Sequence, residues 1–339
     1  MNVEQLQATA MAMVADGQGI LAIDESAGTI AKRLDSVGVE CTEAMRQAYR
    51  QMLLTTPDLG EHISGAILFD ETIRQSTTEG RRFVEVMQSA DVIPGIKVDT
   101  GAHPLAGHPG EKITEGLDGL RARLDEYVEL GARFCKWRAV VTIGDGIPTS
   151  ACVEGNAHAL ARYAALCQEA GLVPMVEPEV LMTGDHDLET SYEVTDATLK
   201  ALFNALDQHS VLLEGTILKA SMVIAGDQCA QQASVAEVAE ATIQCLYNAV
   251  PAATAGIVFL SGGQSEIAAT QHLDAMNRMG PHPWPLSFSY GRALQQGALV
   301  KWGENPSANV QAAQQILAHR AHCNGLATLG QYESELDPS

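Results

Sequence analysis

Three lysines lie inside apolar, strand-like runs of the sequence, where an ammonium group is unexpected. They are Lys97 in VIPGIKV, Lys136 in FCKWRAVV and Lys219 in GTILKAS, and the whole chain has only seven lysines. Lysine is normally exposed, and a buried ammonium is strongly destabilising unless it is paired. A structural ion pair would explain one such residue, but three on different strands indicate a functional site.

A buried lysine amine can form a Schiff base with a carbonyl substrate. The amine attacks only in its neutral form, which burial and a neighbouring cation both favour. Lys219 has apolar neighbours in the sequence, and Lys136 supplies the cation if the two strands place their inward side chains in one layer. We therefore predict that Lys219 is the nucleophile of an imine mechanism, in which the protonated imine withdraws electrons from an adjacent C–C bond.

Carboxylates at three positions can supply the proton transfers that this chemistry needs. Glu177 and Glu179 in VEPEV share one face of a strand, because side chains two apart point the same way. Glu177 is the candidate acid and base for carbinolamine dehydration and imine hydrolysis, with Glu179 beside it. Glu177 can also form an ion pair with Lys136 or Arg138 of the preceding strand, and this role does not exclude proton transfer. Asp24 in AIDES is a candidate base for a substrate hydroxyl, unless it caps the following helix, a task that Ser26 can also perform.

Two consecutive loops have the composition of phosphate-binding sites. FLSGGQS (259–265) is a strand end followed by a helix, and the backbone N–H groups of Gly262 and Gly263 can hold a phosphate at that helix N-terminus. SFSYGRAL (287–294) repeats this arrangement and adds Arg292, whose guanidinium can bind phosphate through two N–H groups. One such loop is common by chance, but two together favour a phosphorylated substrate.

The elements that must position these residues alternate along the chain. Continuously apolar runs, as expected of parallel strands covered on both faces, lie at 20–24, 63–70, 93–98, 134–141, 172–180, 215–221, 256–263 and 286–291. Helical patterns separate them, for example at 26–38, at 154–171 with Gly171 at its end, and at 234–250, which opens with a capping box from Ser234 to Glu237. Eight strand–helix units predict an α/β protein, a (β/α)8 TIM barrel.

We expect one barrel domain over residues 1–339, with an added N-terminal helix at 1–18 and a C-terminal helix and short tail at 305–339. A doubly wound open sheet is the competing architecture. Against it, no GxGxxG follows the first strand and the composition does not change between the halves. In a barrel the charged residues named above fall at the C-terminal ends of the strands, where the active sites of this fold lie.

The excess of acidic residues restricts the partners. The chain has 42 acidic and 21 basic residues, a formal net charge of −21, which argues against nucleic acid and anionic membranes; a locally positive cleft can still bind a small anion. The start of the chain lacks the basic segment ahead of an apolar run that a signal peptide has. No apolar run reaches the roughly 18 residues of a membrane span. The seven cysteines form no CxxC pair. We expect a cytoplasmic protein with reduced thiols.

Metal catalysis is an alternative that the ten histidines and the segment GDHD (184–187) suggest. No HxH or HExxH pattern is present, and His319 and His322 lie three residues apart on a C-terminal helix. We expect GDHD to be a solvated loop, and we predict neither a metal nor an organic cofactor.

With these residues in place, the sequence from about 17 to 330 resembles the class I fructose-bisphosphate aldolases. The stretches that carry the resemblance are GILAIDESAGTIAKRL, ILFDETI, GIKVDTG, PLAGHPGE, GLDGL, FCKWRAVV, LARYA, VPMVEPEVL, GDHDL, LEGTILKASMV, FLSGGQSE and FSYGRAL. The resemblance implies a (β/α)8 barrel that cleaves fructose 1,6-bisphosphate reversibly and without a metal to dihydroxyacetone phosphate and glyceraldehyde 3-phosphate, in glycolysis and gluconeogenesis. It also implies a homotetramer.

Matched by motif, the resemblance implies that Lys219 is the imine lysine, Glu177 its acid and base, and Asp24 the group at the C4 hydroxyl. Lys136 and Glu179 complete the charged layer. The remaining implied residues bind the substrate: Ser261, Gly262, Ser289, Gly291 and Arg292 at the C1 phosphate, Lys97, Arg33, Lys32, Ser26 and Thr29 around the C6 phosphate, and Arg138 in the KWR motif.

Two departures from the family pattern affect the chemistry. The animal enzymes end in a mobile tail whose terminal tyrosine assists proton transfer at C3, whereas this chain ends GQYESELDPS with Tyr332 away from the end. Another group must then move that proton, or the step is slower. Ala220 and Ser221 follow the imine lysine where the family usually has proline and asparagine, which changes the stiffness of the loop and not the nucleophile.

Two other functions remain open from the sequence. One is an aldolase of the same chemistry that prefers another phosphosugar, such as fructose 1-phosphate or tagatose 1,6-bisphosphate. The other is an inactive barrel retained as a binding or scaffold protein, which a turnover assay decides.

Overall fold

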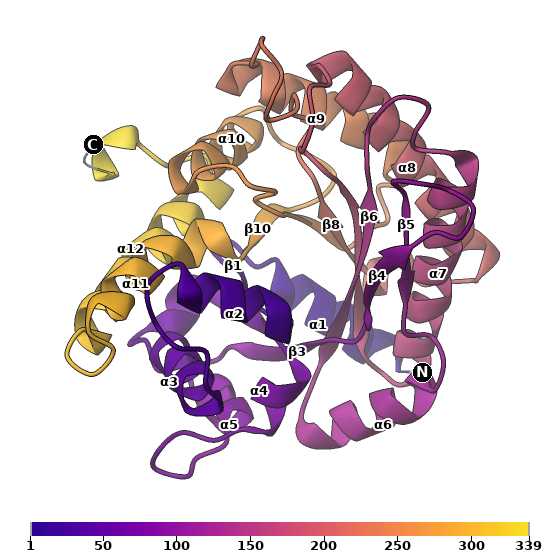
Figure 1. Cartoon of the computed structure of the whole chain (residues 1–339). Coiled ribbons are helices and arrows are strands. Elements are labelled where there is room, and N and C mark those ends of the chain that lie inside the picture. The colour runs from indigo at the N-terminus through magenta and orange to yellow at the C-terminus, as the bar shows by residue number, and fades with distance from the viewer. Residues whose placement is uncertain (1, 338–339) are drawn as a thin grey trace.

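Eight parallel strands close into a barrel at the centre of the molecule (Figure 1). The structure is a computed structural model and describes residues 2–337. The barrel strands are β1 (Gly19–Ile23), β2 (Ile63–Leu68), β3 (Ile93–Lys97), β6 (Phe134–Val141), β7 (Val173–Val180), β8 (Ile217–Ala220), β9 (Gly256–Phe259) and β10 (Leu286–Tyr290). Each overlaps one of the eight runs predicted from the sequence, so the prediction of a (β/α)8 barrel is confirmed.

The strands follow one another around the barrel in chain order, apart from a short hairpin that the sequence analysis missed. Each pairs in parallel with its neighbours, and β10 pairs with β1 to complete the ring. A closed ring has no edge strands and no reversal of strand order, which excludes the doubly wound open sheet. The hairpin, β4 (Gly101–Pro104) with β5 (Lys112–Glu115), is antiparallel and follows β3.

Helices return the chain from the end of each strand to the start of the next and surround the barrel (Figure 1). They are α1 (Val3–Met13), α2 (Ala27–Asp35), α3 (Glu43–Leu54), α4 (Asp70–Arg74), α5 (Phe83–Ser89), α6 (Leu120–Leu130), α7 (Ser150–Glu169), α8 (Leu188–Gln208), α9 (Val235–Ala249), α10 (Glu266–Arg278), α11 (Arg292–Glu304) and α12 (Val310–Thr328). Short 3-10 turns are η1 (Leu59–Glu61), η2 (Leu213–Gly215) and η3 (Ser334–Leu336).

The helix ends show how well local sequence signals work. The capping box of Ser234 and Glu237 is present at the start of α9, as predicted. The predicted helix at 154–171 begins earlier, because the side chain of Thr149 accepts a hydrogen bond from Cys152 N and caps α7. The predicted helix at 26–38 ends at Asp35.

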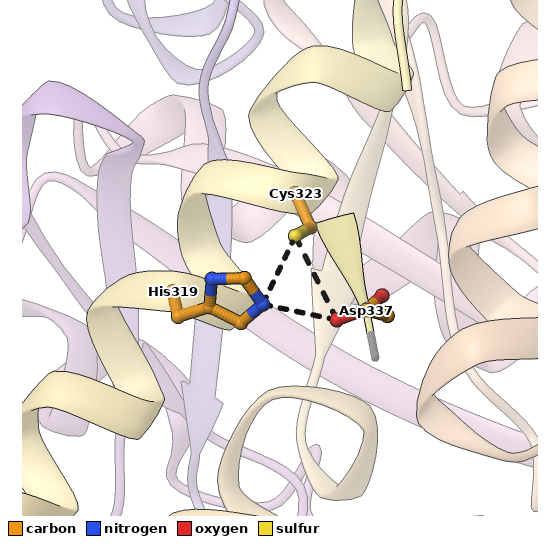
Figure 2. Close-up of side chains that lie close together, drawn as sticks. All are labelled: His319, Cys323 and Asp337. Atoms are coloured by element: carbon orange, nitrogen blue, oxygen red, sulfur yellow. Dashed lines mark hydrogen bonds and ion pairs between the residues drawn. The ribbon is translucent and has the colours of Figure 1, made fainter. Parts of the chain in front are cut away.

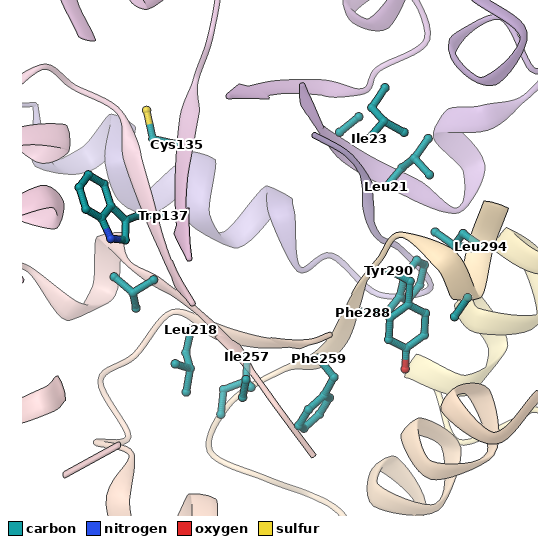
Figure 3. Close-up of a cluster of buried hydrophobic side chains, with 14 of the residues drawn as sticks. Leu21, Ile23, Cys135, Trp137, Leu218, Ile257, Phe259, Phe288, Tyr290 and Leu294 are labelled. Atoms are coloured by element: carbon teal, nitrogen blue, oxygen red, sulfur yellow. The ribbon is translucent and has the colours of Figure 1, made fainter. Parts of the chain in front are cut away.

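Side chains of the strands alternate between two cores. Cys135, Trp137 and Leu218 belong to the outer core between strands and helices, whereas Phe134 and Ile217 belong to the core inside the barrel. Figure 3 shows the outward side chains around the barrel. By this period of two, the lysines of β6 and β8 point inward.

Helix α1 closes the N-terminal end of the barrel. Its Leu6, Ala10 and Met13 are fully buried and pack with inward side chains of the strands, among them Phe134 and Ile217. The interior is therefore open only toward the C-terminal ends of the strands. In the described part of the chain, residues 2–337, no helix is long and apolar enough to cross a membrane.

Candidate active site

Two lysines and two carboxylates form a chain of ion pairs inside the barrel. Lys219 Nζ lies 3.1 Å from Glu177 Oε1, and Lys136 Nζ lies 2.9 Å from Glu177 Oε2 and 2.8 Å from Asp24 Oδ2. The side chains of both lysines are only 5% exposed and that of Glu177 is 3% exposed. The structure thus brings together four of the five residues predicted to be catalytic, and it pairs Asp24 with Lys136 instead of using it as a helix cap.

Ion pairing outweighs burial for the charges of this cluster. Burial disfavours the carboxylates, but Lys136 and Lys219 nevertheless hold the pKa of Asp24 well below its ordinary value of 3.8 and lower the pKa of Glu177. Burial also disfavours the ammonium of Lys136, yet Asp24 and Glu177 raise its pKa above the ordinary 10.5. Lys136 is therefore a fixed cation, and Glu177 is an anion shared between it and Lys219.

The Asp24–Lys136 pair makes stability dependent on pH at the acid end. Because the folded-state pKa of Asp24 is depressed, its contribution is complete above the unfolded value of 3.8 and is lost as the pH falls below it. Asparagine cannot titrate, so Asp24→Asn should lack this pH dependence. We expect the difference in unfolding free energy between the wild type and Asp24→Asn to shrink by on the order of 2 kcal/mol from neutral to low pH. Denaturant titrations of both proteins at neutral and acid pH measure this difference. A difference that stays constant with pH would contradict the depressed pKa of Asp24.

A second layer of ion pairs lies beside the first. Arg138 Nε donates to Glu179, and Arg138 N donates to Asp99 Oδ2 at 3.1 Å. Asp99 also holds Lys97, with 2.8 Å between Oδ1 and Nζ. Glu179 is thereby the counter-ion of Arg138, while Glu177 is the counter-ion of the two central lysines.

The predicted phosphate loops end β9 and β10 next to each other. Ser289 Oγ is buried and makes no hydrogen bond within the described residues, as expected of a donor that awaits a ligand. The N-terminus of α11 begins at Arg292, a position that favours anions. Gly263 has φ +111°, and a Cβ atom there would lie 2.9 Å from Met182 Sδ, so the loop requires glycine.

The segment that follows β1, including helix α2, lines the site next to the β10 loop, because β1 pairs with β10. Ser26, Thr29 and Arg33 line the site, and Arg33 Nη2 reaches to within 3.5 Å of where a Cβ of Gly291 would lie. Arg33 is therefore closer to the β10 loop than the motif comparison implies. Lys32 is exposed and is not among the lining residues, because one helical step turns its side chain about 100° away from that of Arg33.

The residues that the motif match assigned to catalysis and substrate binding, except Lys32, line one cavity of about 670 Å³ at the C-terminal ends of the strands. Its size is that of a site for a small organic ligand. Eight of the 21 basic residues of the chain line it, against six of the 42 acidic residues. A protein with a net charge of −21 thus has a cavity of positive balance, suited to an anionic substrate.

Several lining residues escaped the sequence analysis: Glu25, Asp99, Lys112, Arg123 and Tyr127. Asp70, the last residue of the run predicted at 63–70, also lines the cavity. Glu25 binds Arg33 and also accepts from Arg50 Nη2 at 2.5 Å, so it holds Arg33 in place. Asp99 could have been identified from the sequence, because it follows Lys97 by two residues in IKVD and both side chains then lie on one side of the strand end.

Two segments that the sequence analysis singled out have structural roles. The loop at 184–187 is held against 226–228 by backbone bonds, among them Gly226 N to His186 O at 2.8 Å, and forms no metal-ligand group within residues 2–337. The hydroxyl of Ser221 lies 3.1 Å from both the backbone N and O of Val180, and so ties the loop after β8 to β7.

Tyr332 lies away from the cavity. Its ring is buried, its hydroxyl donates to Asp337 Oδ2 at 2.7 Å, and its N–H donates to Asp274 Oδ1 at 2.9 Å. It is fixed near α10 and α12, so it does not replace a mobile terminal tyrosine in this arrangement.

The comparisons with known proteins agree with the geometry. The family model described as "Fructose-bisphosphate aldolase class-I" matches residues 5–339. A protein of Xylella fastidiosa named "Probable fructose-bisphosphate aldolase class 1" is 64% identical over 98% of this chain and all of its own length, and the fructose-bisphosphate aldolase of Dictyostelium discoideum is 49% identical over 98% and 94%. The solved fructose-bisphosphate aldolase of Plasmodium falciparum superposes with a TM-score of 0.96 at 46% identity, covering 97% of this chain and 95% of that one. The family assignment made from the sequence motifs is confirmed: the chain belongs to the class I fructose-bisphosphate aldolase family.

Proposed function

We propose that this enzyme cleaves fructose 1,6-bisphosphate, reversibly, to dihydroxyacetone phosphate and glyceraldehyde 3-phosphate through an imine on Lys219. The observation that supports this most directly is the contact of 3.1 Å between the buried Lys219 Nζ and Glu177 in a cavity of positive balance. The family match supplies the substrate class.

Imine formation uses Glu177 as both base and acid. Glu177 accepts a proton from the Lys219 ammonium, and the free amine attacks the ketone carbon C2 of the substrate. Glu177 then returns a proton to the carbinolamine oxygen, which leaves as water, and the nitrogen becomes a protonated imine. Lys136 stays cationic throughout and keeps Glu177 within 2.9 Å.

Cleavage of the C3–C4 bond follows when a base removes the C4 hydroxyl proton. Asp24 is that base in our proposal, because its carboxylate lines the cavity and stays ionised beside Lys136. The electron pair of the C3–C4 bond moves to the imine, the C4 aldehyde leaves as glyceraldehyde 3-phosphate, and an enamine remains on Lys219. Protonation of the enamine at C3 and hydrolysis of the imine release dihydroxyacetone phosphate.

The two phosphates take two different parts of the cavity in our proposal. The C1 phosphate lies at Ser261, Gly262, Ser289, Gly291 and Arg292, where the unpartnered Ser289 Oγ and the N-terminus of α11 meet. The C6 phosphate lies toward Lys97, Ser26, Thr29 and Arg138, and Arg33, beside Gly291, lies close to the C1 group.

A coupled turnover assay tests the proposed substrate. We expect higher kcat/KM for fructose 1,6-bisphosphate than for fructose 1-phosphate or tagatose 1,6-bisphosphate, and unchanged turnover after EDTA treatment, because the lysine imine itself serves as the electron sink. A preference for one of the other two sugars would change the proposed substrate but keep the imine chemistry. Absence of turnover with all three sugars would favour the alternative of a binding protein.

Arg292 should matter for phosphate binding more than for bond breaking. We expect Arg292→Ala to lower kcat/KM about 10- to 100-fold, mainly through KM, because it removes a charged hydrogen-bond donor to the C1 phosphate. Lys301→Ala, at the other end of the same helix, is the matched control and should leave both constants unchanged. Equal KM values for Arg292→Ala and the wild type would place the C1 phosphate elsewhere.

We further propose that the enzyme is a cytoplasmic homotetramer. The family resemblance supports the tetramer, and the seven free cysteines, five of them buried, support a reducing compartment. The mass of the particle in solution, compared with 36.0 kDa for one chain, tests the assembly.

A further inference from the structure

A second group of chemically active side chains lies outside the barrel, on α12 and the segment that follows it. Figure 2 shows His319 and Cys323, one helical turn apart, facing Asp337 of the C-terminal segment. None of the three lines the active-site cavity. In the sequence His319 and His322 are three residues apart and were not predicted to bind a metal. In the structure His319 contacts Cys323, which shares its helix face at the i, i+4 spacing.

We propose that His319, Cys323 and Asp337 bind a divalent zinc-like metal ion. The three ligand atoms are 3.0 Å (His319 Nε2 to Asp337 Oδ1), 3.6 Å (His319 Nε2 to Cys323 Sγ) and 3.9 Å (Cys323 Sγ to Asp337 Oδ1) apart. Tetrahedral zinc with ordinary Zn–N, Zn–O and Zn–S bonds requires separations of roughly 3.3 to 3.6 Å between such atoms. The atoms therefore already form one face of a tetrahedron and need only small shifts.

The donors and their surroundings suit this ion. Imidazole, thiolate and carboxylate together select zinc over calcium or magnesium, which prefer oxygen ligands alone. The second carboxylate oxygen, Asp337 Oδ2, is held by Arg320 Nη1 and, at 2.7 Å, by Tyr332 Oη, which leaves Oδ1 free to be the ligand. Such hydrogen bonds to a ligating carboxylate are typical of real metal sites.

The exposure of the three ligands is also compatible with metal binding. Cys323 is fully buried, the side chain of Asp337 is 9% exposed, and that of His319 is 44% exposed, which gives the ion a path from solvent. Three protein ligands leave a fourth position for water, and the thiol proton of Cys323 passes to solvent when the metal binds. The ion would fasten the C-terminal segment to α12, because Asp337 lies just after η3.

Cobalt binding to the full chain, after removal of metal with a chelator, tests the site. We expect one equivalent of Co²⁺ to bind with the near-ultraviolet charge-transfer band of a cobalt–thiolate bond, and Zn²⁺ to abolish the band by competition. Cys323→Ser should lose the band, and the matched variant Cys229→Ser, at a partly exposed cysteine elsewhere, should keep it. His319→Gln and Asp337→Asn should each weaken binding at least 10-fold, and Tyr332→Phe by roughly 10-fold through the orientation of Asp337.

Several outcomes would overturn the proposal. They are no band in the wild type, a band that survives Cys323→Ser, or a loss of binding in His322→Gln, which would move the site to the pair His62–His322. The cluster would then only dock the tail through the ion pair of Arg320 with Asp337. Aldolase turnover, expected to be unchanged in all these variants, shows that each is folded, so a loss of metal binding is not a loss of structure.

Discussion

Lys219→Met is expected to lower kcat/KM for fructose 1,6-bisphosphate by roughly 10⁵-fold or more while the barrel stays folded. Loss of a covalent nucleophile commonly has an effect of this size. Methionine matches the length of the lysine side chain but cannot form an imine. Glu177 keeps its second partner, Lys136, at 2.9 Å, so no buried carboxylate is left without a cation.

Steady-state kinetics and the circular dichroism melting curve measure this effect. Lys200→Met is the control, since Lys200 is exposed and forms its ion pair with Asp196 on its own helix, away from the cavity; it should retain full activity. Lys219→Met with more than a hundredth of wild-type activity and a normal melting curve would mean that the nucleophile is another amine.

Glu177→Gln should have the second largest effect, on both chemistry and stability. Removal of a general acid and base lowers kcat by about 10²- to 10⁴-fold. The substitution also leaves Lys136 and Lys219 without their shared carboxylate in a buried site, which costs about 3 kcal/mol or more of unfolding free energy. Kinetics and urea unfolding of the same preparation measure the two losses.

Glu179→Gln separates the two carboxylates. Within residues 2–337 Glu179 forms one ion pair, with Arg138, whose side chain is partly exposed. We therefore expect a smaller loss of stability and a smaller effect on kcat than in Glu177→Gln. Equal effects of the two substitutions would show that both glutamates act as one electrostatic unit and would contradict a proton-transfer role specific to Glu177.

The sequence was most informative where one physical signal was strong. A continuously apolar run is typical of a buried parallel strand, so the strands could be predicted, and a lysine within such a run is so unfavourable that Lys97, Lys136 and Lys219 stood out. The alternation along FCKWRAVV and VPMVEPEV also predicted correctly which side chains share the interior.

Other features depend on contacts that no local pattern encodes. The β4–β5 hairpin is short and half exposed, so it lacks the apolar run that marks the barrel strands. Glu25 pairs with Arg50 of α3, and Asp99 accepts a hydrogen bond from the backbone N–H of Arg138 in β6, so both contacts join elements that are far apart in the sequence. Lys32 was included because the motif GILAIDESAGTIAKRL matches the family, but it adjoins Arg33, and adjacent residues of a helix point in different directions. The approach of Asp337 to His319 likewise requires the chain to fold back after α12.

Trapping of the imine tests the central claim most directly. Borohydride added with dihydroxyacetone phosphate should inactivate the enzyme irreversibly, and peptide mapping by mass spectrometry should find the reduced three-carbon adduct on Lys219 alone, with no adduct in Lys219→Met. An enzyme that keeps its activity through this treatment, or an adduct on Lys97 or Lys136 in place of Lys219, would contradict the mechanism.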